Sequence, residues 1–368
     1  MFVSIYKLPW FAKVILLMRN MKGFLLGGMV FLSAIAGVMY YQYEVKETWP
    51  NRELTLKQVS LAEKRNAEYR ASKIDASTRT NNYTTKGDYL NYGATKKIWV
   101  SSRVKLDDEG IPMVKYGEDY QYNPVTISQY ALSEHGRAVS DGSKSYDVSS
   151  VKFKLAVKKL LLLQDGDGAF RYHFPYRHYT NAVPYADGWV SGMAQGVALS
   201  AIARDYIMSK DEALIEAGDK AVSFLRVPAT EGGPFTTLSD LDPSLSEYIF
   251  FQEYLTSPNV YTLNGFMFAL LGLYDWNVAT KSEDAKYLFL RGVDTLVKIL
   301  PYYDMEHMSS YDLSYITHKR PAYLVQQEPH IAPRYHAVHI SLLQAIYSVT
   351  GNAVVKEYKD RWSKYVGE

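Results

Sequence analysis

Residues 257–275, SPNVYTLNGFMFALLGLYD, are the strongest indication of how this chain folds. Their apolar residues recur at helical spacing and predict a helix over 262–279 that is buried around most of its circumference. One stripe of this helix is apolar. A second stripe consists of small residues that let a neighbouring helix approach closely: Gly265, Ala269 and Gly272. We therefore expect this segment to be an inner helix of a helical core.

Polar side chains gather where this buried helix begins. Asn264 and Tyr261 lie at its start, and Glu253 and Tyr254 lie shortly before it. Inner helices of a ring of helical hairpins point one set of ends into a cavity, so polar groups there face a substrate rather than bulk solvent. On these residues alone, Glu253 could equally be a surface carboxylate beside a packing tyrosine.

Helix pairs recur along the chain from about residue 148. Each of three similar segments has an apolar helix ending near a tyrosine, then a short polar turn and an amphipathic helix; the tyrosines are Tyr206, Tyr274 and Tyr347. The other predicted helices are 148–164, 190–208, 211–226, 283–300, 338–349 and 353–366. A repeat of roughly 70 residues made of paired helices predicts a mainly α fold, an incomplete α/α toroid.

A smaller region precedes these helices. Residues 97–116 alternate enough for a β-hairpin, and a helix is predicted from Pro124 to about Glu134. The predicted divisions are a polar stalk or arm (44–95), a β-hairpin and first helix over the cleft (96–147), and a catalytic toroid (148–368).

The N-terminus predicts a membrane anchor. Four basic residues in 1–22 precede nineteen uncharged residues, 23–41, which are enough to span a bilayer as a transmembrane helix. The basic flank predicts a cytoplasmic 1–22 and a catalytic part outside the cytoplasm, as in a periplasmic or other extracytoplasmic domain. A cleaved signal peptide is the alternative, because Ala34-Ile35-Ala36 resembles a cleavage site, and the protein would then be secreted.

Composition narrows the chemistry. The formal net charge of +2 gives no basic field, so no nucleic-acid partner is predicted. The absence of cysteine excludes thiolate catalysis, disulfides and cysteine-ligated metals. The 32 tyrosines against 14 phenylalanines suit a carbohydrate cleft, although tyrosine also fills cores and interfaces.

Two motifs could suggest a metal site. His336 and His339 are three residues apart, but the HExxH pattern and a third ligand are missing. Residues 164–168, QDGDG, do not meet the calcium-loop pattern and are interpreted as a helix C-terminus with glycines. No metal and no cofactor are predicted.

Three blocks carry a resemblance to a known family. GWVSGMAQGVALSAIARDY (188–206), EYLTSPNVYTLNGFMFALLGLYD (253–275) and YHAVHISLL (335–343) resemble the D-glucuronyl C5-epimerases of heparosan and heparan sulfate. The likeness covers about 97–366. Animal members carry a β-sandwich where this chain has only a loop and a helix, so it looks like a minimal, bacterial-type member. The resemblance implies isomerisation of glucuronate to iduronate in a heparosan-like acidic polysaccharide, without cofactor, by a homodimer.

Two departures from the family affect recognition of the substrate carboxylate. The family motif Tyr-Asp-Leu-Arg stands here as residues 311–314, Tyr-Asp-Leu-Ser, so an arginine is replaced by Ser314. The family arginine three residues before the catalytic tyrosine is also absent, and Arg334 instead directly precedes Tyr335. The carboxylate-binding role is therefore expected to rest on Arg103 and Arg334.

The resemblance implies a carboxylate and a tyrosine as the proton-transferring pair, here Glu253 and Tyr335. Glu253 is expected to be the base in the forward direction and Tyr335 the acid, because ionising a tyrosine at pH 7 costs roughly 4 kcal/mol. Tyr254 and Tyr311 are expected to hydrogen-bond the sugar or the enediolate. The other expected substrate contacts are Arg103, Tyr122, Gln129, Ser191, Gln195, Asn264, Arg334 and His336.

Several alternatives stay open at this point. Tyr311 could be structural, Arg103 could pair with Asp107 or Asp108 across its hairpin, and Gln129 could cap its own helix. A polysaccharide lyase begins with the same proton abstraction, and a membrane protein that binds uronans without turnover would keep the same cleft.

Overall fold

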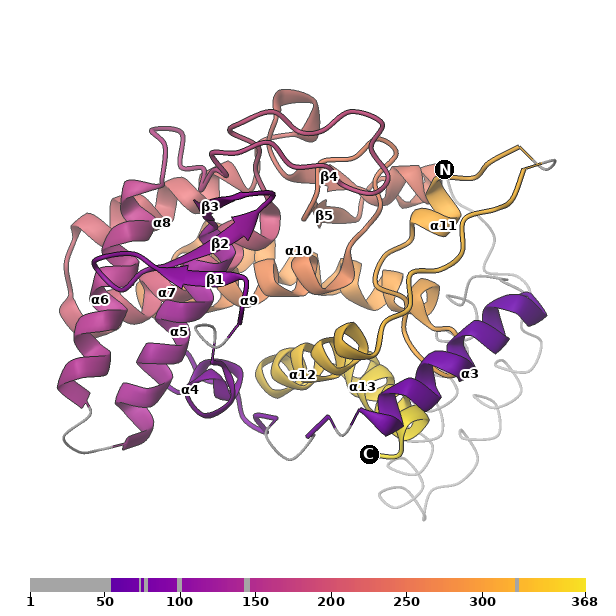
Figure 1. The fold of residues 1–368 in the computed structure, drawn as a ribbon, viewed down its shortest axis with the longest axis horizontal. Helices are drawn as coiled ribbons and strands as arrows, with labels where there is room; N and C mark the ends of the chain where they lie inside the picture. The colour runs from indigo at the N-terminus through magenta and orange to yellow at the C-terminus, as the bar shows by residue number, and fades with distance from the viewer. Residues whose placement is uncertain (1–53, 73, 76–78, 98–100, 142–145, 322–323) are drawn as a thin grey trace, which may run out of the picture. The chain divides into compact units, whose positions relative to one another are not determined.

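The computed structural model describes residues 54–368 except 73, 76–78, 98–100, 142–145 and 322–323 (Figure 1). The described part is mainly helical, as expected. The predicted transmembrane helix, 23–41, lies outside the described residues. Within the part of the chain that is described, no helix combines the length and the apolar character needed to cross a bilayer.

The predicted helices are present with shifted ends, the largest shift being that of α5, which extends seven residues beyond the predicted end at Glu134. They are α5 (Pro124–Asp141), α6 (Tyr146–Leu162), α7 (Gly192–Ser209), α8 (Ala213–Phe224), α9 (Leu263–Thr280), α10 (Glu283–Tyr303), α12 (Pro333–Thr350) and α13 (Ala353–Val366). The short helices are α4 (Tyr92–Thr95) and α11 (Ser314–Thr317). Helix α12 begins five residues earlier than expected because Pro333 occupies its first turn, where a missing amide costs nothing.

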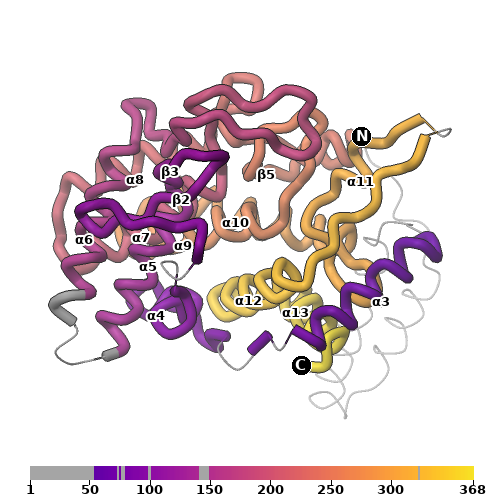
Figure 2. The backbone as a smooth tube through the Cα atoms, in the orientation of Figure 1, coloured from indigo at the N-terminus to yellow at the C-terminus, as the bar shows by residue number. Residues whose placement is uncertain are grey.

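Helices α7 and α9 are mostly buried and lie side by side (Figure 2). Small residues bring them together: a Cβ at Gly196 would lie 2.3 Å from the Ala269 Cα, and one at Gly272 would lie 2.1 Å from the Gly196 carbonyl oxygen. The predicted small-residue stripe is confirmed at Ala269 and Gly272. Gly265 contacts a different group, Glu253, described below.

Short turns join the predicted helix pairs α7–α8, α9–α10 and α12–α13. The C-cap residues Lys210, Lys281 and Gly351 each adopt the left-handed conformation, which ends the first helix of the pair and turns the chain. The pairs are thus observed, whereas their closure into an α/α toroid stays a prediction.

An antiparallel sheet of three strands lies against α5, in the order β1 (Val104–Leu106), β2 (Pro112–Tyr116) and β3 (Asp119–Tyr122). The predicted hairpin is β1–β2. Its turn is held by Asp107, whose Oδ1 accepts the amides of Glu109 at 3.0 Å and Ile111 at 2.8 Å. Strand β3 was not expected.

The segment before the sheet is packed on the helical core. It begins with α3 (Leu56–Ala71), which contacts α12 and α13. Further along, Tyr83 and Thr85 donate hydrogen bonds to the buried Asp275 carboxylate, at 2.5 and 2.7 Å, which also pairs with Arg204 at 2.8 Å. These contacts fix the residues that lead to α4 and to one wall of the cleft.

Candidate active site

A cleft of about 690 Å³ lies where the sheet, α5 and the N-terminal ends of α7, α9 and α12 meet. The lining residues predicted from the sequence are Arg103, Gln129, Ser191, Glu253, Tyr254, Asn264 and Tyr335. Glu253 and Tyr335 are far apart in sequence, and the fold brings both to this one cleft.

Glu253 is delivered by the short hairpin of β4 (Phe235–Thr237) and β5 (Ile249–Phe251). Two residues after β5, its side chain lies against the first turn of α9. A Cβ at Gly265 would stand 2.3 Å from Glu253 Oε2, so only glycine leaves room for this carboxylate. Helix α9 begins without a hydrogen bond from the side chain of its N-cap, Thr262. Because Glu253 lies against Gly265, its carboxylate is close to the positively polarised end of α9.

Burial dominates the electrostatics of Glu253. The side chain is 7% exposed, and its Oε2 accepts no hydrogen bond from the described residues. Desolvation raises the pKa of Glu253 to about 7, and the hydroxyl groups of Tyr254 and Tyr311 oppose this rise. A carboxyl group with such a pKa is a stronger base than a solvated glutamate and still ionises near neutral pH.

Three tyrosines surround Glu253. Tyr254 and Tyr335 line the cleft, whereas Tyr311 is buried and does not. The hydroxyl of Tyr311 donates to Glu253 Oε1 at 3.4 Å, and its ring lies against that of Tyr335 with 4.1 Å between centroids. Burial, and then Glu253, raise the pKa of Tyr335, so its phenol is protonated at neutral pH.

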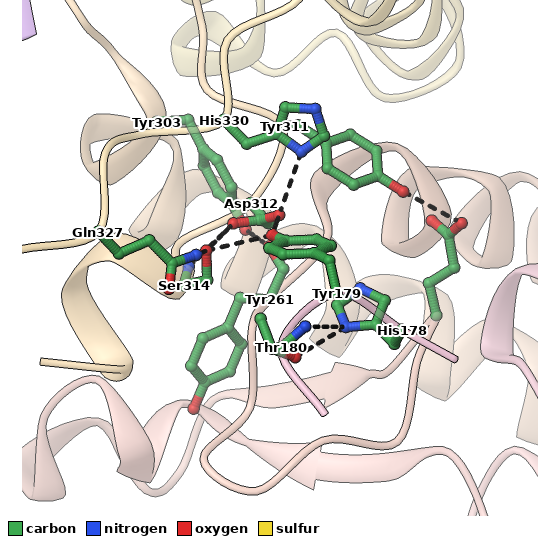
Figure 3. Close-up of polar contacts among 11 residues, drawn as sticks. His178, Tyr179, Thr180, Tyr261, Tyr303, Tyr311, Asp312, Ser314, Gln327 and His330 are labelled. Atoms are coloured by element: carbon green, nitrogen blue, oxygen red, sulfur yellow. Dashed lines mark hydrogen bonds and ion pairs between the residues drawn. The ribbon is translucent and has the colours of Figure 1, made fainter. Parts of the chain in front are cut away.

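Asp312 organises a polar network beside these tyrosines (Figure 3). Its carboxylate accepts the Ser314 amide at 2.9 Å and the Ser314 hydroxyl at 2.6 Å, and it also accepts the hydroxyl of Tyr179. The Nδ1 atom of His330 lies 3.7 Å from Asp312 Oδ2. Ser314 thus anchors the buried Asp312 and is itself bonded by the Gln327 amide at 2.6 Å.

Besides Tyr311, four residues expected in the substrate site lie outside the lining of this cleft. The side chain of Gln195 is fully buried, with its amide oriented toward the backbone of Gly168 at 3.1 Å and Phe170 at 2.7 Å. His336 is buried between the Ser309 hydroxyl at 2.8 Å and the Trp362 carbonyl at 3.1 Å, and burial lowers its pKa to about 4. These two side chains therefore support the core.

The other two residues point to different places. Tyr122 donates to Asp107 Oδ2 at 2.6 Å and holds the hairpin turn. Arg334 is exposed and lines a separate hollow between α3 and α12. Tyr335 is the lining residue that this hollow and the cleft have in common. Side chains at adjacent positions of a helix point about 100° apart around its axis. Because Tyr335 points into the cleft, Arg334 and His336 point away from it.

The residues that do reach the cleft leave polar groups available to a ligand. Asn264 is 4% exposed, and its buried Oδ1 accepts no hydrogen bond within the described residues. Ser191 caps α7, accepting the Ala194 amide at 3.4 Å.

Arg103 does not pair across its hairpin. It donates to the Lys115 carbonyl at 3.0 Å and makes no ion pair with Asp107 or Asp108. Asn123, rather than Gln129, caps α5 by accepting the Thr126 amide at 3.1 Å.

Sequence reasoning missed other lining residues. Lys96 and Lys97 line the same cleft as Arg103 and make no ion pair within the described residues. These three residues are called the cationic rim. Three aromatic residues form one wall: Tyr172, Tyr176 and Trp189, with Trp189 stacked on Tyr172 at 3.7 Å between centroids. In the sequence, the adjacent Lys96 and Lys97 at the start of the predicted hairpin could have indicated a positively charged cleft. Trp189 was expected at the mouth of the helix that follows it, whereas no sequence spacing indicated Tyr172 or Tyr176.

Comparison with known proteins assigns the chain to a family. The sequence pattern described as D-glucuronyl C5-epimerase C-terminus matches residues 164–364. The chain belongs to that family. It is 30% identical over 190 residues to a D-glucuronyl C5-epimerase of Caenorhabditis elegans, covering 48% of this chain and 29% of that protein. It is 27% identical over 196 residues to an uncharacterized protein of Methanocaldococcus jannaschii, covering 52% and 56%. The chain thus spans less than two thirds of either relative.

The side chains of the cleft can be compared with what an epimerase needs. It offers one carboxylate with a raised pKa, phenols that stay protonated, and a rim of cations. Within the described residues, no group of three or more metal-ligating side chains lies together. The carboxylate and the phenols of the cleft can move protons to and from a substrate.

Proposed function

We propose that this chain is an epimerase that inverts C5 of glucuronate residues, forming iduronate within a heparosan-like acidic polysaccharide. The observation that carries the proposal is that Glu253 and Tyr335 line one cleft with Arg103 and Lys96 on its rim. A proton acceptor and a proton donor on two sides of one sugar are what inversion at a carbon alpha to a carboxylate requires.

Glu253 removes the C5 proton, and the electrons pass into the substrate carboxylate to give an enediolate. Tyr335 then gives its phenolic proton to C5 from the opposite face. In the reverse direction the two residues exchange roles. The raised pKa of Glu253 supports its role as base, because a base matched to neutral pH transfers protons most effectively.

The substrate carboxylate is held by the cationic rim. Arg103, Lys96 and Lys97 carry the charges that the enediolate needs as its own charge grows. Tyr254 and the free Oδ1 of Asn264 bond sugar hydroxyl groups, and Gln129 and Ser191 complete the polar wall. Arg334 is left out of this assignment, because it lines the other hollow.

The wider organisation belongs to the same proposal. Paired helices close into an incomplete α/α toroid that works as a homodimer. Residues 23–41 anchor the chain, and the catalytic part acts outside the cytoplasm on an exported polymer.

Incubation with heparosan in heavy water tests this function. Deuterium at C5, together with iduronate and no absorbance from an unsaturated uronate, is the expected result. New absorbance would identify a lyase, which begins with the same abstraction and then expels the C4 substituent. Binding of the polymer with no exchange at C5 would contradict both enzymatic functions.

A further inference from the structure

The proposed reaction leaves the two acting residues in the wrong protonation states. After one inversion of glucuronate, Glu253 carries the proton taken from C5 and Tyr335 is a phenolate. A second turnover in the same direction requires a proton to return from Glu253 to Tyr335. The question therefore rests on the proposed function, and it concerns the resetting of the site.

Tyr311 joins these two residues. Its hydroxyl lies 3.4 Å from Glu253 Oε1, and its ring packs on Tyr335 with 4.1 Å between centroids and 35° between planes. Tyr311 is 4% exposed and is absent from the cleft lining, so it lies behind the two cleft residues. This position suits proton exchange between them better than contact with the sugar.

The backbone holds Tyr311 firmly in that position. Its carbonyl accepts the Leu263 amide at 3.1 Å, which ties it to the start of α9. Its amide donates to the His330 carbonyl at 2.6 Å, which ties it to the segment leading into α12. Glu253 lies against α9 and Tyr335 lies on α12, so the same residue is fixed to both supports.

The charge state of Tyr311 also suits a relay. Burial, and then the Glu253 carboxylate, raise its pKa well above the usual value, so Tyr311 remains a neutral hydroxyl. A neutral hydroxyl can accept one proton while it donates another. The Tyr311 hydroxyl also lowers the pKa of Tyr335, which places it within influence of that phenol.

We propose that Tyr311 resets the site by passing a proton from Glu253 to Tyr335 after each inversion. The O–H bond of protonated Glu253 breaks as its proton moves to the Tyr311 oxygen. The original Tyr311 O–H bond breaks as its proton moves to the Tyr335 phenolate. Glu253 is again a carboxylate, Tyr335 is again a phenol, and Tyr311 is unchanged.

A second route to Tyr335 has to be separated from this relay. The His330 side chain is 40% exposed and meets Tyr311 and Tyr335 edge-on, at 4.9 and 5.9 Å between ring centroids. It could connect Tyr335 with solvent and make Tyr311 unnecessary. The His330→Gln variant removes that route and leaves the relay in place.

Rapid-quench kinetics on heparosan at pH 8 tests the relay, with the Tyr311→Phe variant at known active-site concentration. Glu253 starts ionised at this pH. We expect a burst of one iduronate per enzyme at a rate near that of the wild type, followed by a steady-state rate at least tenfold lower. Increasing the concentration of a small buffer such as imidazole should raise the steady-state rate and leave the burst unchanged.

The matched control is Tyr89→Phe, which removes a buried hydroxyl that bonds none of the described residues. It should behave as the wild type. Equal losses in burst and steady state for Tyr311→Phe would overturn the relay, as would no loss in either. A large steady-state loss in His330→Gln with none in Tyr311→Phe would also overturn it. A wild type that exchanges no hydrogen at C5 would overturn the proposed function itself, and the relay with it.

Discussion

At the scale of single residues, burial of Glu253 makes its carboxylate a stronger base and lowers the stability of the folded protein. Its pKa rises from 4.5 to about 7 because the folded protein buries the carboxylate. A group whose pKa is raised by folding destabilises the protein once it ionises. The cost is absent below pH 4.5 and complete above about pH 7, where it amounts to about 3 kcal/mol.

The Glu253→Gln variant should therefore be more stable than the wild type by up to about 3 kcal/mol at pH 8 and equally stable at pH 4. It should lose activity by about 10²- to 10⁴-fold. Urea unfolding at the two pH values measures the stability, with the exposed Glu109→Gln as control. An equal stability difference at both pH values would show that the carboxylate is not strained by burial.

The activity profile should follow two groups of the free enzyme. kcat/KM should rise with pH through about 7 as Glu253 ionises. It should fall again above about 8, because burial lowers the pKa of Lys96 to about 8 and the rim then loses a charge. Lys96→Gln should lower kcat/KM and remove the alkaline decline. An unchanged decline in that variant would assign it to another group.

Only some of the residues that line the cleft could be predicted from the sequence. Asn264 and Ser191 were expected at the beginnings of buried helices and Glu253 shortly before one, and all three line the cleft. Gln195 and His336, which were also expected to contact the substrate, are buried and do not line it. Which face of a helix meets the cleft depends on packing, and no local pattern fixed it.

At the scale of elements, two glycines of α9 have different tasks. Gly265 makes room for the Glu253 carboxylate, whereas Gly272 makes room for the backbone of α7. Gly265→Ala should lower kcat about 100-fold by displacing the carboxylate, with little change in Tm. Gly272→Ala should destabilise the fold by about 1–3 kcal/mol through overpacking, with activity retained at low temperature.

Thermal unfolding and initial rates distinguish the two variants. Similar losses of stability and activity in both would mean that Gly265 is only a packing residue. The helices themselves were predictable from apolar spacing and from the small-residue stripe. Strand β3 was missed because its four residues, Asp119–Tyr122, lack a clear alternation of apolar side chains.

At the scale of the whole molecule, a nearly neutral chain concentrates positive charge on one rim. The net charge is +2, yet Lys96, Lys97 and Arg103 all line the one cleft. Arg103→Gln and Lys97→Gln should raise KM for the polymer severalfold with little change in kcat. The increase should shrink at high salt, because the Debye length is about 10 Å at 0.1 M and about 3 Å at 1 M.

KM measured at several salt concentrations checks this prediction. Lys286→Gln on α10 is the control, since that lysine does not line the cleft. A salt-independent KM in the wild type would contradict charge-based recognition of the polymer. Composition could not reveal this rim, because a formal charge summed over the chain conceals where charges gather.

Solvent exchange at C5 by two variants tests most directly whether Glu253 and Tyr335 act from opposite faces. The Tyr335→Phe variant keeps Glu253 and should exchange the C5 hydrogen of glucuronate for deuterium without forming iduronate. The Glu253→Gln variant keeps Tyr335 and should exchange, slowly, only the C5 hydrogen of iduronate. Loss of exchange from the same epimer in both variants, or inversion by either, would contradict the assignment.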